Sequence, residues 1–190
     1  MARDYIESKT FENVDFSETR LQQADYELCT FLCCELTEAL LNNLAFIECK
    51  FIGCNLSNAK VDSAGFRDVK FSGCKLTGVD FSACNPAMIS LSFEDCIMDY
   101  VSLARLHLKK IEFRNCSLIR AFFDDADLSS SKFIGCNLEN AVFGKTNLEK
   151  ADLSTSYNYI IDPENNRVKK AKFSPSGISG LLMKYDIEIV

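Results

Sequence analysis

The 190-residue sequence contains no tryptophan, only three prolines and a single histidine, and no long apolar run. A helix that spans a bilayer needs about 20 consecutive apolar residues, so we expect no membrane association through such a helix. The first ten residues are mostly polar or charged, which is not typical of a secretory signal peptide. We therefore expect a cytoplasmic protein, whose thiols stay reduced.

Sequence motifs of common catalytic sites are also missing. The chain has no glycine-rich phosphate loop, no His-Glu-x-x-His and no Gly-x-Ser-x-Gly. His107 has no paired nucleophile nearby in the sequence, and the carboxylates of Asp124, Asp125 and Asp127 are more typical of a solvated surface than of a metal site. We predict that the protein is not an enzyme, has no cofactor and binds no metal.

The charge is unevenly distributed along the chain. The formal net charge is −6. Residues 1–50 hold ten acids and four bases, whereas the remaining 140 residues hold 17 of each. Proteins that bind nucleic acid need a basic surface, so we predict no nucleic-acid partner. The acidic N-terminal third instead favours a basic partner.

A strict five-residue repeat is the dominant pattern. In steps of five from Ile6 to Phe81, all sixteen positions hold a large apolar residue. The phase then slips by two residues near residues 85–86, and fourteen more positions follow from Met88 to Leu153. A second, mostly small residue precedes each large one by two positions. Neither the helical period of 3.6 nor the strand period of 2.0 explains a strict five.

The sequence pattern within each repeat resembles that of a known family. Ala24-Asp25-Tyr26, Cys54-Asn55-Leu56 and Ala126-Asp127-Leu128 follow the pattern small-Asp/Asn-Leu/Phe-x-x. This pattern resembles the pentapeptide-repeat family. The resemblance implies an all-β solenoid: a right-handed quadrilateral β-helix with four pentapeptides per coil, in which the large and the small residue both point inward.

The repeat also predicts the domain organisation. We expect the β-helix over residues 1–154, with the slip at 85–86 forming a small loop, and a separate C-terminal segment over 155–190. The segment Lys50–Leu56 recurs as Lys132–Leu138, which is four coils of twenty plus the two inserted residues. About seven and a half coils at about 4.8 Å each give a rod of roughly 35 Å.

The ten cysteines follow the same pattern. Nine occupy the small inward position and only Cys33 does not. Cys34, Cys54 and Cys74 are twenty residues apart, so they are expected to form a column. A thiolate column is a conceivable soft-metal site, but a free cysteine also acts as a small apolar core residue, and we favour that interpretation. Cys33 is the one thiol expected to react.

The acids of the N-terminal third are expected to share faces of the rod. The face of Phe16 and Leu36 is predicted to present Asp15, Glu18, Glu35 and Glu38 outward, and a neighbouring face to present Glu7, Asp25, Glu27 and Glu48. Such acids keep a rod soluble and protect its open first coil from edge-to-edge pairing. They also form a surface for a basic partner, and charge alone does not decide between these roles.

The C-terminal segment has a different composition. Ser174-Pro175 is a helix-start signal, and the residues after it predict one apolar helix face followed by a short strand: Ile178, Leu181, Leu182 and Tyr185, then Ile187 and Ile189. The last coil of a solenoid needs a cap, and this helix is predicted to supply it. The same residues form a candidate self-complementary dimer surface.

The tail sharpens the resemblance. Asp162–Arg167 and Gly180–Ile189 resemble the topoisomerase-protecting branch of the family, which includes the Qnr quinolone-resistance proteins, the mycobacterial fluoroquinolone-resistance protein and the microcin B17 immunity protein. The resemblance implies a homodimer joined at the C-terminal ends, which imitates duplex DNA, binds DNA gyrase or topoisomerase IV and protects it from quinolones or peptide toxins. The projecting loops of Qnr proteins have no counterpart in this chain. The alternative is a scaffold or effector that binds an unrelated protein.

Overall fold

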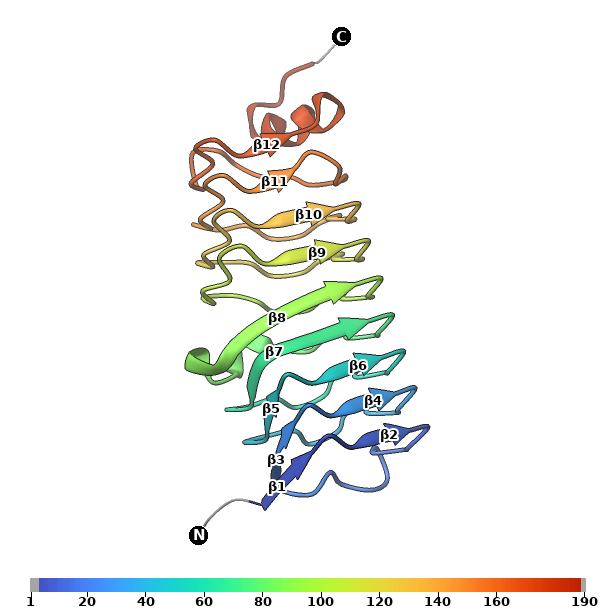
Figure 1. The fold of residues 1–190 in the computed structure, drawn as a ribbon. Helices are drawn as coiled ribbons and strands as arrows, with labels where there is room; N and C mark the ends of the chain where they lie inside the picture. Colours follow the sequence, from blue (N-terminus) through green and yellow to red (C-terminus); the bar gives the residue numbers. More distant parts are fainter. Residues whose placement is uncertain (1–3, 189–190) are drawn as a thin grey trace.

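The computed structural model describes residues 4–188 as a rod of stacked coils with the termini at opposite ends (Figure 1). It confirms the predicted right-handed quadrilateral β-helix, with about eight coils. All strand pairs are parallel and join residues one coil apart, as Phe31 pairs with Phe51 and Phe51 with Phe71. A coil therefore takes twenty residues, which is four repeats.

The strands are short because each repeat turns at its end. They are β1 (Asp4–Glu7), β2 (Thr10–Glu12), β3 (Ala24–Glu27), β4 (Thr30–Leu32), β5 (Ala45–Ile47), β6 (Lys50–Ile52), β7 (Gly65–Ser72), β8 (Ile89–Glu94), β9 (Glu112–Arg114), β10 (Lys132–Ile134), β11 (Asp152–Leu153) and β12 (Lys172–Phe173). The ladder runs β1-β3-β5-β7-β8-β9-β10-β11-β12, and β2, β4 and β6 join it at β7.

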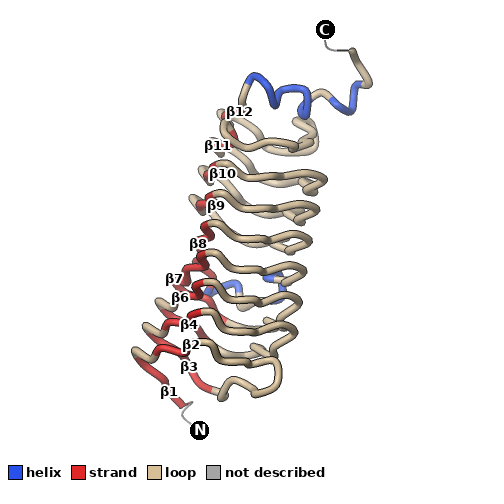
Figure 2. Tube along the Cα trace, turned by 90° about the vertical axis from the view of Figure 1, so that its right-hand side faces the viewer, coloured by secondary structure: helices blue, strands red, loops and turns tan. Residues whose placement is uncertain are grey.

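The four sides of the rod are named here by one buried residue each. In chain order they are the Tyr26 face, the Phe51 face, the Leu36 face and the Leu41 face. The Tyr26 face holds β1, β3 and β5, and the Phe51 face holds β2, β4, β6 and β9 to β12. Strands concentrate along one side in Figure 2 because the other two faces are held by isolated bridges between coils.

The corners explain the five-residue period. Two residues after most of the large apolar residues the backbone adopts a positive φ, for example 53° at Leu28, 56° at Glu38 and 59° at Tyr100. This left-handed conformation turns the chain by one side of the coil, and the corner amide bonds to the next coil, as the Leu28 N–H donates to the Ile47 carbonyl over 2.9 Å. The turn repeats at most corners, so the five-residue period follows from backbone geometry.

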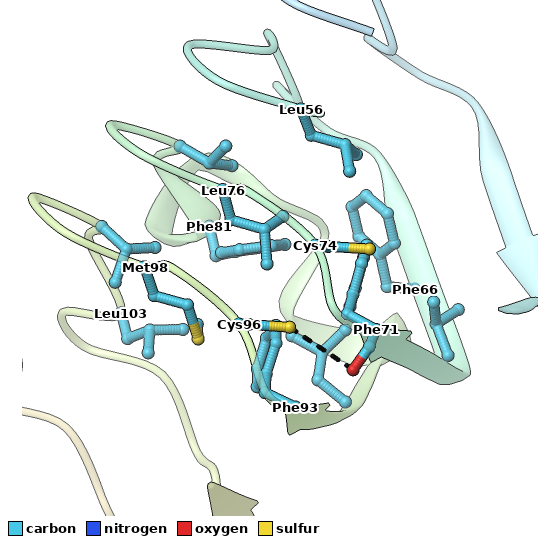
Figure 3. Close-up of a cluster of buried hydrophobic side chains, with 14 of the residues drawn as sticks. Leu56, Phe66, Phe71, Cys74, Leu76, Phe81, Phe93, Cys96, Met98 and Leu103 are labelled. Carbon is cyan, nitrogen blue, oxygen red and sulfur yellow. Dashed lines mark hydrogen bonds between the residues drawn. The ribbon is translucent and has the colours of Figure 1, made fainter. Parts of the chain in front are cut away.

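The core consists of stacked columns of side chains. Along the Phe51 face the rings of Phe31 and Phe51 stack with centroids 4.5 Å apart, and Phe93 stacks on Phe113 at 5.5 Å. Stacked or edge-on aromatic pairs at such distances stabilise a core beyond the area that they bury. Figure 3 shows this packing around Phe71 and Phe93.

The cysteines that are twenty residues apart stack in an inner column, as predicted; the Cys34 N–H donates to the Cys54 Sγ over 3.4 Å. Eight of the nine buried thiols bond to a carbonyl of the preceding coil; the Cys74 Sγ lies 3.3 Å from the Phe51 oxygen, and the Cys96 Sγ lies 3.5 Å from the Phe71 oxygen (Figure 3). Burial raises the pKa of the Cys49 thiol to about 11, which keeps it protonated and unreactive near neutral pH. Cys49 therefore acts as a small core residue, and the other inward cysteines are likewise buried.

The predicted slip is a compact excursion at one corner. The 3₁₀ turns η1 (Phe81–Ala83) and η2 (Pro86–Met88) lie there, and the Asn85 side chain caps η2 by accepting the Ala87 N–H over 3.1 Å. Between β7 and β8 the paired residues Phe66 and Ile89 are three residues further apart in sequence than the regular twenty, whereas Val69 and Leu91 are two further apart. A bulge between these pairs absorbs the difference of one residue. The columns continue beyond it, with Phe93 opposite Phe113.

The coil ladder runs past residue 154, where the sequence pattern ends. Asp152 pairs with Lys172 and Leu153 with Phe173. The large-residue position is occupied by Asn158 and Pro163 in this coil, which breaks the apolar pattern, but the small inward position is still filled by buried side chains: Ser156, Ile161 and Asn166. Asn166 replaces apolar packing with hydrogen bonds, accepting from Thr146 N at 2.8 Å and donating to the Phe143 carbonyl at 2.9 Å.

A helical cap closes the C-terminal end, but its geometry differs from the expected one. It consists of the 3₁₀ helices η3 (Pro175–Leu181) and η4 (Met183–Tyr185), and Ser174 caps η3 by accepting the Gly177 N–H. The expected terminal strand is not formed at Ile187 and Glu188, and Ile189 lies outside the described residues.

Candidate partner-binding surfaces

Asp15 and Glu35 lie one above the other on the Leu36 face, joined by a bridge between their coils. Asp15 is exposed and accepts from the Ser17 N–H and hydroxyl over 2.9 and 2.6 Å. Glu35 is half-buried and accepts from the Thr37 N–H over 2.8 Å and from Asn55 over 3.1 Å. Hydrogen bonds from Ser17 lower the pKa of Asp15, and those from Thr37 and Asn55 lower the pKa of Glu35 against the opposing effect of burial. Both carboxylates are therefore ionised at neutral pH, and both also hold turns.

Glu18 and Glu38 add two further carboxylates to the Leu36 face. Both are exposed, and Glu38 stands at a left-handed corner with φ of 56°. The structure thus brings together the four acids that were predicted for this face.

Asp25 and Glu27 do not lie on a neighbouring face. They are half-buried on β3, where Asp25 is in register with Tyr5 and Glu27 with Glu7. Ten residues, half of a twenty-residue coil, separate Glu27 from Thr37 on the Leu36 face. The two acidic groups therefore occupy opposite sides of the N-terminal half, which corrects the predicted adjacency.

The C-terminal end presents apolar side chains to solvent. Ile178, Tyr185 and Ile187, which belong to the candidate dimer surface, are each about half exposed, and Met183 joins them at 59% exposed. Met183 escaped the sequence argument because it lies off the predicted helical stripe. Leu181 instead packs against the core and belongs to the cap, and Leu182 is half-buried.

A network of charged side chains fastens this cap to the last coil. Lys184 Nζ lies 2.7 Å from Asp162 and 2.6 Å from Glu164, and the Tyr185 hydroxyl donates to Glu164 over 2.7 Å. The hydrogen bonds from Lys184 hold the pKa of both carboxyl groups below their usual range. The Asp162–Glu164 segment is therefore a support for the cap.

A shallow groove of about 470 Å³ crosses the Phe51 face. Its outer walls carry charges of both signs and one apolar side chain, from Lys50, Lys70, Ile52, Glu94 and Arg114. The sequence did not single out this groove, because its residues come from four coils. Its mixed charge favours no one ligand class.

Within residues 4–188, no three His, Cys, Asp or Glu side chains are placed to hold one metal ion. No described helix is long and apolar enough to cross a membrane. The exposed His107 lies on the Tyr26 face beside Lys109.

Comparison with known proteins identifies the fold family. The sequence matches the pentapeptide repeat region over residues 44–123 and 87–143, which is more than half of the chain. The chain belongs to the pentapeptide repeat family. No curated protein matches it.

Solved pentapeptide repeat proteins share its architecture. A trypsin-treated form of QnrB1, a plasmid-mediated fluoroquinolone resistance protein, is 19% identical with a TM-score of 0.63 over 99% of this chain and 98% of its own. A second trypsin-treated form is 21% identical with a TM-score of 0.53 over 100% and 95%. HetL, a protein involved in heterocyst differentiation regulation in the cyanobacterium Nostoc, is 18% identical with a TM-score of 0.56 over 90% and 86%. At these identities the likeness concerns the fold alone.

Proposed function

We propose that this pentapeptide repeat protein is a non-catalytic binding protein that imitates duplex DNA and engages a type II topoisomerase, either DNA gyrase or topoisomerase IV. The observation that carries the proposal is the pair of acidic surfaces on opposite sides of the N-terminal half. Duplex DNA likewise presents phosphates from two strands on a rod, at about 3.4 Å per strand. Here the acids recur at the coil spacing of about 4.8 Å.

The chemistry of the acids fits this role. The carboxylates of Asp15 and Glu35 are held ionised and fixed by the turns that they cap. A fixed anionic surface attracts a basic DNA-binding groove and raises the association rate. Protection from quinolones or peptide toxins would follow where the rod displaces DNA from the enzyme. The fluoroquinolone resistance associated with QnrB1 is consistent with this consequence.

The same proposal includes a homodimer joined at the C-terminal ends. Its basis is the exposed apolar side chains of the C-terminal end: Ile178, Met183, Tyr185 and Ile187. Met183 and Ile187 line a groove of about 140 Å³ there. Joining two rods there would place an acidic half at each outer end.

An alternative function is that of a scaffold or effector for an unrelated protein. The likeness to HetL, which is similar in extent, favours it, because one fold hosts unrelated functions. Mimicry would also be confined to part of the rod, since the acids concentrate in residues 1–50.

The test is a gyrase supercoiling and drug-stabilised cleavage assay, with the same assay on topoisomerase IV. The variant is Glu18→Lys with Glu38→Lys, because both side chains are exposed; reversing Asp15 or Glu35 would also remove turn contacts. We expect the half-effective concentration to rise at least about tenfold, which corresponds to about 1.4 kcal/mol.

The matched control is Asp125→Lys with Glu139→Lys, which makes the same charge change outside the acidic half. Asp125, like Glu38, is an exposed corner residue. Equal activity of the variant and the control would contradict mimicry by the acidic half. No effect of the unmodified protein on either enzyme would favour the scaffold alternative, which affinity capture of a different partner would then support.

A further inference from the structure

The charge on the Tyr26 face reverses sign along the rod. Up to Asp68, its outward positions and following corners hold five acids and one base, a net charge of −4: Glu7, Asp25, Glu27, Glu48, Arg67 and Asp68. Beyond His107 they hold six bases and two acids, a net charge of +4: Lys109, Lys110, Asp127, Glu149, Lys150, Arg167, Lys169 and Lys170. The two halves are therefore equal and opposite.

Several of these charged side chains form no ion pair with another described residue of the chain. In the acidic half, Glu7, Glu27, Glu48 and Asp68 form no ion pair among the described residues. In the basic half, Lys109 pairs with Asp127 at 3.4 Å and Arg167 with Glu149 at 2.8 Å. Four lysines form no ion pair over the same residues: Lys110, Lys150, Lys169 and Lys170. The hydrogen bond from Arg167 lowers the pKa of Glu149, and Lys169 and Lys150 lie near enough to add to this effect.

The unpaired charges are arranged symmetrically about one coil, the coil of Ile89, which pairs with Phe66. Asp68 lies one coil before it and Lys110 one coil after. Glu27 and Lys150 each lie three coils away on opposite sides, and Glu7 and Lys169 four coils away. A second copy turned end for end would therefore place a base at the level of three of the four acids.

We propose that the Tyr26 face binds the Tyr26 face of a second copy of this chain, antiparallel, with the two-fold axis crossing the coil of Ile89. A two-fold interface uses the same patch on both copies, so the patch must complement itself when reversed, as this one does. A parallel copy would set like charges together and be repelled. A partner with one sign of charge would be attracted by one half and repelled by the other.

The centre of the face is occupied by η2 and by a mixture of polar and apolar side chains. Met88 of η2 packs over Gly65, Ala45 is buried, Ile47 and Ile89 are half-buried, and Arg67 and Ser90 are exposed. Exposed ion pairs contribute at most about 1 kcal/mol each and are screened beyond about 10 Å at 0.1 M salt. The contact is accordingly a modest, salt-sensitive association. It is separate from the C-terminal surface. It covers the acids of the Tyr26 face, which form one of the two acidic surfaces of the proposed function, and leaves Asp15 and Glu35 on the opposite face free.

The experiment is sedimentation analysis of the full chain over a concentration series at 50 and 500 mM NaCl. A base-half variant carries Lys150→Glu and Lys170→Glu, and an acid-half variant carries Glu7→Lys and Glu27→Lys. Each variant alone is expected to dimerise at least about tenfold more weakly at low salt, since two to four attractive pairs become repulsive. High salt is expected to weaken the dimer of the unmodified chain.

Mixing the two variants is the decisive arm, because their altered halves complement each other and a heterodimer is expected to form. The control Lys60→Glu with Lys145→Glu changes the charge equally on the Leu41 face and is expected to leave the dimer unchanged. The variant Ile178→Asp with Ile187→Asp tests the C-terminal surface separately. The proposal is overturned if the chain stays monomeric at low salt, if dimerisation responds only to the isoleucine changes, or if folded variants fail to pair when mixed.

Discussion

At the scale of single residues, the corners carry the main conformational cost of the fold. Most corner residues are not glycine, yet they hold a positive φ that costs an ordinary L-residue about 1–2 kcal/mol. Leu28 is an extreme case, because its φ is 53° and its side chain is 48% exposed, so little packing offsets the cost.

We expect Leu28→Asn to stabilise the protein by about 1 kcal/mol, because asparagine tolerates the left-handed conformation better than leucine does. Chemical denaturation at 500 mM NaCl, where lateral association is weak, measures the change. The control is Leu40→Asn, at an exposed position without positive φ. If both substitutions change the free energy of unfolding alike, removal of exposed apolar surface, and not corner strain, is the cause.

The corner positions could not be predicted from the sequence. Gly53 and Asn58 are typical left-handed residues, but Tyr100 and Lys150 occupy equivalent corners and are not. The inward positions were predictable because burial accepts only apolar side chains of a certain size. The corner accepts nearly any residue, since the stacked ladder compensates for its local cost.

At the scale of elements, the C-terminal cap depends on two close backbone contacts. A methyl group at Gly180 would overlap the Tyr159 carbonyl oxygen, and one at Gly177 would overlap the Tyr159 hydroxyl. The Ile161 N–H also donates to the Gly180 carbonyl over 3.0 Å. The cap therefore rests directly on the last coil.

We expect Gly180→Ala to destabilise the cap by about 1–3 kcal/mol, the usual cost of overpacking a buried site. Amide hydrogen exchange at Ile161 is the measurement, and its protection is expected to fall. Ser179→Ala, at an exposed neighbouring position, serves as the control. Unchanged protection at Ile161 in the glycine variant would show that the cap is not seated as described.

The cap illustrates what a periodic pattern leaves undecided. Ile178 and Leu181 are three residues apart, a spacing that α- and 3₁₀ helices share. Their neighbours Leu182 and Tyr185 completed an α-helical stripe in the sequence. The structure has 3₁₀ helices, with Gly180 placed against the coil, which the apolar pattern alone does not reveal.

At the scale of the whole molecule, the two ends of the rod are unequal. The C-terminal coil is covered by η3 and η4, whereas the first described coil leaves Ile6, Phe11 and Val14 only partly buried. In a solenoid each coil contacts only its neighbours, so stability is lost from an uncovered end first.

We therefore expect amide exchange to be at least about tenfold faster at Thr30 and Glu35 than at Lys132 and Asp152. The first two amides donate to the first coil, at Lys9 O and Val14 O, and the last two donate to inner coils near the cap. Native-state exchange at low denaturant resolves the difference. Equal protection at both ends would mean that the rod unfolds as one cooperative unit.

Much of the architecture was predictable because the repeat states the same inward pattern thirty times. The sequence analysis was wrong about how some residues lie relative to the coils. Asp25 and Glu27 were assigned to a neighbouring face although half a coil separates them from Thr37. The end of the coils was set at residue 154 because Asn158 and Pro163 interrupt the apolar series while the backbone ladder continues to Phe173.

The twenty-residue coil also sets how this chain can change its length. Inserting or deleting one whole coil leaves every inward column and outward face aligned, and shifts the ends by about 4.8 Å. A change of five residues would rotate all later side chains by one face. Twenty codons are therefore the natural unit by which gene duplication or protein engineering can lengthen or shorten this rod.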